Sequence, residues 1–142
     1  MAQSRRALRA LGQVALGGAL LAAGAGHLTS QREEFQAQVP PWVPLDPDLV
    51  VVASGVVELG LGATLLAVWR QPVRGLVGAA VAAFFVAVFP GNVAQLTERR
   101  DAFGLDSDAK RAVRLVFQPV LVAWALTTTG AVGAVRQLRA SS

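Results

Sequence analysis

Four long stretches almost free of charged side chains limit the fold of this chain more than any other feature. Residues 10–31, 75–97 and 115–135 contain no charged residue, and residues 49–69 contain only Glu58. A helix of about 20 apolar residues is long enough to cross the ~30 Å hydrocarbon core of a bilayer. The apolar residues do not alternate with polar ones, as the strands of a membrane barrel require. We therefore expect an all-α protein, a polytopic membrane four-helix bundle.

The expected bundle is a single transmembrane domain covering residues 1–142, with spans near 9–28, 49–69, 74–95 and 114–135. Composition agrees, because only 15% of the residues are charged, against about 25% in an ordinary soluble domain. The absence of cysteine excludes disulfides, thiolate metal sites and a cysteine nucleophile. The formal charge of +4 comes from arginines beside the apolar stretches, without a base-reading pattern, so we expect no nucleic-acid partner.

The basic residues predict how the helices are oriented. Arginines without a neighbouring acid precede the first span, separate the second from the third and follow the fourth, whereas loops 32–48 and 98–114 mix acids with bases. The arginines are Arg5, Arg6, Arg9, Arg70, Arg74, Arg136 and Arg139. Since cytoplasmic loops are enriched in arginine and lysine, we expect a multi-pass protein of the cell membrane with both termini in the cytoplasm. The basic, apolar start also resembles a cleavable signal peptide, but its apolar part is long enough to remain as the first helix.

The segment between the first two spans, residues 35–48, is rich in proline. Proline lacks a backbone N–H and breaks a helix interior, so a regular helix is excluded there. We expect an extended or turning connector at the outer surface, broken at Pro40, Pro41, Pro44 and Pro47.

Polar side chains within the spans gather in their expected outer halves. They are His27, Ser54, Glu58, Asn92, Arg114 and Gln118. The inner halves hold only Gln13, Thr64 and threonines 127–129, whose hydroxyls can bond to their own helices. Because polar groups in hydrocarbon are costly, we expect the outer group to line a ligand-binding polar chamber that opens outward.

Glu58 carries the strongest signal in this group, because an acid within a span needs a partner or a proton. His27 and Arg114 are the candidate partners. A purely structural role stays open for each residue: His27 could cap its helix and Arg114 could reach the headgroups. Asn92 could bind carbonyls freed by Pro90. One histidine and one glutamate are too few ligands for a typical metal site, so we expect no metal and no intrinsic cofactor.

Five stretches carry these residues in order: AGAGHL, FQAQVPPWVP, VVASGVVELGLGATLL, AVFPGNVAQL and VRLVFQPVLVAWAL. In combination they resemble the DoxX family, specifically its DoxX-like four-helix branch. Leu28 departs from the family pattern where an aromatic residue often follows the histidine, and Gly91 stands where alanine is common. The resemblance assigns the family's characteristic positions to His27, Pro44, Ser54, Gly55, Glu58, Pro90, Asn92, Arg114, Gln118 and Trp124.

The resemblance implies a subunit of a membrane oxidoreductase system, while distant relatives act in membrane-protein assembly. With the outer chamber, it predicts a redox-associated membrane subunit that binds a quinone or a lipid-like molecule. Catalytic residues are unknown, and we expect no enzyme activity from the chain alone. Besides the lipid bilayer, the expected partner is a membrane oxidoreductase or a second copy of the chain. The alternative is a non-catalytic assembly or stabilising subunit. A solute or proton pathway is disfavoured because the inner halves offer no matching polar route.

Overall fold

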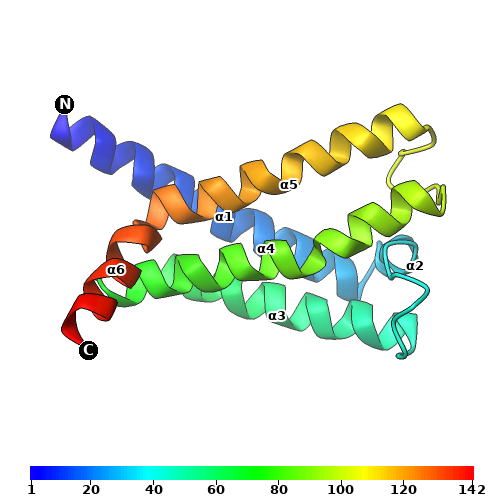
Figure 1. Cartoon of the computed structure of the whole chain (residues 1–142), viewed down its shortest axis with the longest axis horizontal. Coiled ribbons are helices and arrows are strands. Elements are labelled where there is room, and N and C mark those ends of the chain that lie inside the picture. Colours follow the sequence, from blue (N-terminus) through cyan, green and yellow to red (C-terminus); the bar gives the residue numbers. More distant parts are fainter.

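The computed structural model describes residues 1–142 as helices joined by loops, with no strand, so the all-α prediction is confirmed (Figure 1). The helices are α1 (Ala2–Leu28), α2 (Arg32–Gln36), α3 (Pro47–Ala67), α4 (Val73–Thr97), α5 (Asp108–Thr129) and α6 (Ala131–Ser141). Four of them, α1, α3, α4 and α5, are long and apolar enough to cross a membrane, as a multi-pass membrane protein requires.

The elongated molecule has two distinct ends (Figure 1). Both chain termini, α6 and loop 68–72 lie at one end, which we call the terminal end. The opposite end, which we call the loop end, carries α2 and loops 37–46 and 98–107. The long helices run between these two ends.

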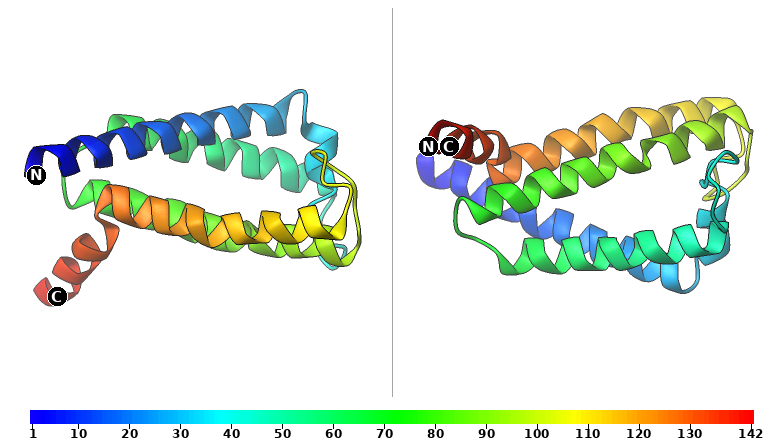
Figure 2. Two further views of the ribbon diagram at one scale, coloured as in Figure 1. Left: turned by 90° about the horizontal axis from the view of Figure 1, so that it is seen from above. Right: turned by 60° about the horizontal axis from the view of Figure 1, so that its bottom comes forward.

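The long helices pack in two pairs, α1 with α3 and α4 with α5 (Figure 2). Apolar side chains from all four helices form the core between the pairs. Its buried members are Leu16, Leu20, Leu65, Val81, Ala82, Phe85 and Ala125. Most other apolar side chains of the long helices point outward, which suits a surface in contact with lipid rather than water.

The start of α3 follows from its first residues. The Asp46 carboxylate accepts hydrogen bonds from the backbone N–H groups of Asp48 and Leu49. Pro47 occupies the first turn, where its missing N–H would have had no helical partner. The other prolines of the connector lie outside the helices, as their sequence predicted.

The end of α5 is set by Gly130, whose φ of 72° is a left-handed conformation that favours glycine. The chain turns there, and α6 leaves the direction of α5 (Figure 2). The expected fourth stretch, 114–135, is therefore divided: α5 ends at Thr129, and residues 131–135 belong to α6.

Candidate functional site

A cavity of about 240 Å³ lies among the four long helices and α2, on the side of the loop end. All the predicted site residues except Ser54 line it. Its polar lining is His27, Gln38, Glu58, Asn92, Arg114 and Gln118. The remaining lining is apolar, from residues such as Leu20, Phe84 and Leu121. The fold thus brings together polar groups that are far apart in the sequence. Ligand binding by these groups stays a prediction.

Close approach of α1 to α3 places His27 beside Glu58. A Cβ atom built on Gly55 would lie 2.6 Å from the Cβ of His27, and one on Gly24 would lie 2.8 Å from the carbonyl oxygen of Gly55. Both distances are shorter than real Cβ contacts, so glycine is needed at each position for the helices to come this close. Glu58 follows Gly55 by three residues and lies on the same face of α3.

The imidazole of His27 stands between two oxygen atoms. Its Nδ1 lies 2.8 Å from the carbonyl oxygen of Ala23 and 2.8 Å from Oε2 of Glu58. Nδ1 carries at most one proton, and hydrogen-bond geometry is met only toward Ala23, so Oε2 of Glu58 has no hydrogen-bond partner. Of the two candidate partners of Glu58, the structure places His27 next to the carboxylate, whereas Arg114 forms no ion pair with it.

Gln118 joins Asn92 and Arg114 at the other side of the cavity. Its Oε1 accepts hydrogen bonds from Nδ2 of Asn92 at 3.3 Å and from Nη1 of Arg114 at 3.2 Å. Its Nε2 donates to the carbonyl oxygen of Phe85 at 2.6 Å. Oδ1 of Asn92 is buried without a partner. Asn92 therefore bonds to Gln118 rather than to the backbone around Pro90.

Ser54 lies in a neighbouring cavity of about 200 Å³, on the side of the proline-rich connector. Its hydroxyl donates to the carbonyl oxygen of Val51 on the preceding turn at 3.0 Å. The side chains that line both cavities, and so separate them, are His27, Phe35, Gln38 and Val88. The rings of His27 and Phe35 stack with centroids 3.4 Å apart. Ser54 is thus near the other predicted residues without joining them.

Some polar atoms in the 240 Å³ cavity lack hydrogen-bond partners, and they define what the cavity can hold. Glu58 Oε2 and Asn92 Oδ1 are acceptors that need a donor. Arg114 is a donor that is half-buried without an acidic partner. Buried polar groups are normally paired, because an unpaired one costs about 1–3 kcal/mol. A small polar group with both hydroxyl and carbonyl character, surrounded by apolar surface, would complete these bonds.

A second polar network, which sequence reasoning did not identify, lies at the terminal end. The fully buried Gln13 donates through Nε2 to the carbonyl oxygens of Leu65 at 2.7 Å and Val68 at 2.9 Å. Its Oε1 accepts from Nε of Arg74 at 2.6 Å, and Arg74 also donates to the carbonyl oxygen of Thr128 at 2.8 Å. The only sign of this network in the sequence was the single polar side chain of Gln13 within an apolar stretch. Its partners could not be predicted, because they come from two helices that are distant in the sequence.

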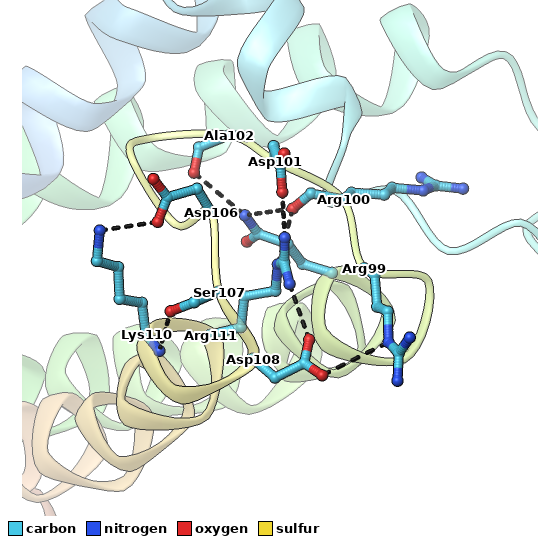
Figure 3. A network of polar contacts seen from close by, with 10 residues as sticks. Arg99, Arg100, Asp101, Ala102, Asp106, Ser107, Asp108, Lys110 and Arg111 are labelled. Carbon is cyan, nitrogen blue, oxygen red and sulfur yellow. Dashed lines mark hydrogen bonds and ion pairs between the residues drawn. The ribbon is translucent and has the colours of Figure 1, made fainter.

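A third network closes the loop end around Arg111, a residue that was also missed. Arg111 is only 5% exposed and donates to the carbonyl oxygen of Arg100 and to the carboxylates of Asp101 and Asp108 (Figure 3). Gln95, which is 1% exposed, donates to the same carbonyl of Arg100 at 3.4 Å. These contacts hold loop 98–107 against the ends of α4 and α5 at the loop end.

Comparison with known proteins gives a family without a known role. Residues 16–129 match the model of a family described as a domain of unknown function, DUF8561. No curated protein matches the chain, and no solved structure matches it.

Proposed function

The chain belongs to the DUF8561 family, whose function is unknown, and we propose that it is a membrane subunit that binds a quinone or a lipid-like molecule in the 240 Å³ cavity. One observation carries the proposal: Glu58 Oε2 and Asn92 Oδ1 accept no hydrogen bond, although Glu58 contacts His27. Both residues line this cavity together with Arg114, which has no acidic partner. A quinol hydroxyl would donate to the acceptors, and a quinone carbonyl would accept from Arg114.

An apolar groove next to the cavity supports a ligand with a long tail. The groove, about 440 Å³, is lined by Val86, Phe89, Pro119, Val122 and other residues of α4 and α5. Gln118 lines both the groove and the cavity. Since a quinone or lipid has a polar head and an apolar chain, the head would occupy the cavity and the chain would follow the groove toward the bilayer.

The proposed setting is the cell membrane, with the long helices as a transmembrane bundle and the termini in the cytoplasm. The basic residues of the terminal end support this orientation, because arginine is enriched on the cytoplasmic side. The loop end and the cavity would then lie in the outer half of the bilayer.

The redox part of the proposal rests on the resemblance to the DoxX family. In that reading the chain supplies a binding site within a larger membrane oxidoreductase, and the partner carries the redox centres. The six residues assigned to the site are His27, Ser54, Glu58, Asn92, Arg114 and Gln118, with Ser54 in the adjoining cavity.

Native mass spectrometry of the full chain, purified in a neutral detergent and mixed with decylubiquinol, tests the site. We expect one quinol bound to the wild type and at least about tenfold weaker binding to Glu58→Gln, because a lost hydrogen bond to a charged acceptor costs about 1.5–3 kcal/mol. Glu33→Gln makes the same chemical change at an exposed position and should bind normally. The proposal would be refuted if the wild type retained no quinol, or if Glu58→Gln and Glu33→Gln bound quinol equally well.

A stabilising subunit is the second candidate, and the contact between His27 and Glu58 favours it because that contact joins α1 to α3. In this role Glu58→Gln should keep both abundance and complex formation, whereas Glu58→Leu should lower the amount of protein in the membrane. Normal abundance of Glu58→Gln with lost binding would instead favour the ligand site.

A further inference from the structure

The terminal end of the molecule carries positive charge without negative charge. No acidic residue precedes Glu33, and none occurs in residues 59–97 or 109–142. The arginines of this end form no ion pair. They are Arg5, Arg6, Arg9, Arg70, Arg74, Arg136 and Arg139. A surface region with one sign of charge attracts ligands of the opposite sign.

A wide cavity of about 670 Å³ lies within this basic region, between the start of α1, the end of α5 and α6. Arg9 is its charged lining residue, and Gln137 and Thr127 add neutral hydrogen-bonding groups. Leu8 and Val132 line it as well, and these apolar side chains are 67% and 47% exposed. The cavity therefore combines a cation with apolar surface that remains open to the surroundings.

Arg9 differs from Arg74, the other arginine near this cavity. Arg74 is committed to the protein through its bonds to Gln13 and Thr128. Arg9 is exposed and has no acidic partner, and its charge repels that of Arg74. An anion at Arg9 would relieve this repulsion.

The helix α6 has the features of a helix that lies at a membrane surface. Its residues Ala131 and Ala134 are buried against α4 at Gly75, where there is no room for a Cβ atom. Arg136 and Arg139 are exposed on the rest of the helix. With 11 residues, α6 is too short to cross a bilayer, and a short amphipathic helix with a cationic face is typical of the headgroup region.

We propose that this cavity binds the headgroup of one anionic phospholipid, with the phosphate against Arg9 and the acyl chains along Leu8 and Val132. Charge complementarity selects an anionic over a zwitterionic lipid, because the whole terminal end lacks acids. The site lies at the opposite end of the molecule from the cavity of Glu58, so it does not depend on the quinone proposal.

Native mass spectrometry with an equimolar mixture of phosphatidylglycerol and phosphatidylcholine of the same chains tests this site on the full protein. We expect one phosphatidylglycerol to remain bound. Arg9→Gln should weaken its affinity about fivefold, since one arginine contact to an anionic lipid contributes about 1 kcal/mol. Arg5→Gln, which removes the same charge from the same helix outside the cavity lining, should weaken binding less than Arg9→Gln does. Arg9→Lys should retain the lipid.

Three results would overturn the proposal. Equal retention of phosphatidylcholine would show that charge does not select the lipid. Equal losses in Arg9→Gln and Arg5→Gln would show diffuse attraction instead of a site. Displacement of the lipid by inorganic phosphate, but not by sodium chloride at the same ionic strength, would mean that the cavity takes a free phosphate. Circular dichroism of each variant checks that the helices are intact.

Discussion

Replacement of Gly55 by alanine tests whether helix separation positions Glu58. The new Cβ would lie 2.6 Å from the Cβ of His27 and 3.2 Å from the carbonyl oxygen of Gly24. Since non-bonded carbons pack best about 3.5–4.0 Å apart, α1 and α3 must separate by about 1 Å at this level. Overpacking of this kind costs about 1–3 kcal/mol. The same separation would break the 2.8 Å contact between Nδ1 of His27 and Oε2 of Glu58.

Gly60→Ala is the matched control on the same helix, because nothing lies within 4 Å of a Cβ built there. Both variants gain the higher helix propensity of alanine, about 1 kcal/mol, so their difference isolates the packing cost. We expect reversible unfolding in mixed micelles to show Gly55→Ala less stable than Gly60→Ala by about 1–3 kcal/mol. Decylubiquinol binding should fall only in Gly55→Ala. Equal stability of the two variants would refute the argument that these glycines set the helix separation.

Two further predictions concern the ends of the molecule. Gln13→Leu removes the hydrogen-bond donor of the Leu65 and Val68 carbonyls. It should lower the free energy of unfolding by at least about 2 kcal/mol and leave quinol binding unchanged. A variant as stable as the wild type would contradict this. Lys110→Gln should let the pKa of Asp106 rise toward its ordinary value of about 3.9, because the hydrogen bond from Lys110 lowers the pKa of that carboxyl. Carbon-13 NMR titration measures it, and an unchanged pKa would refute the pairing. Since the folded-state pKa is lowered, the stabilisation from the pair is present above the ordinary pKa and is lost as the pH falls through the lowered value.

The long helices could be predicted from the sequence, because a helix that crosses the hydrocarbon core must be about 20 residues long and nearly free of charge. The runs without charge give the four long helices, and the proline-rich connector gives the non-helical segment between α2 and α3. The short helix α2, which includes the first two residues of that connector, was not predicted. The break at Gly130 could not be read in the same way. Glycine is common throughout the apolar stretches, and only its left-handed φ of 72° distinguishes this position.

The sequence predicted the polar residues that the long helices contribute to the cavity, but it missed Gln38 of the connector and did not predict the pairing. Periodicity places Glu58 on one face of α3, yet the choice of His27 over Arg114 depends on the distance between helices that Gly24 and Gly55 allow. Ser54 shares the face of Glu58 on the sequence, but the stacked ring of Phe35 from α2 helps to divide the space, so Ser54 lines the next cavity. Such contacts between distant segments leave no local signal.

The two ends of the bundle use buried amides differently, and this difference favours a binding role for the loop-end cavity. At the terminal end, Gln13 bonds through both its nitrogen and its oxygen, as a purely structural contact requires. In the cavity, Oδ1 of Asn92 has no partner, and Oε2 of Glu58 contacts His27 without accepting a hydrogen bond. A cluster selected only to lock helices would gain stability by closing those bonds, because each open one costs about 1–3 kcal/mol. Open acceptors are instead expected where a bound molecule supplies the missing donors, so Glu58→Gln should alter ligand affinity more than it alters the free energy of unfolding.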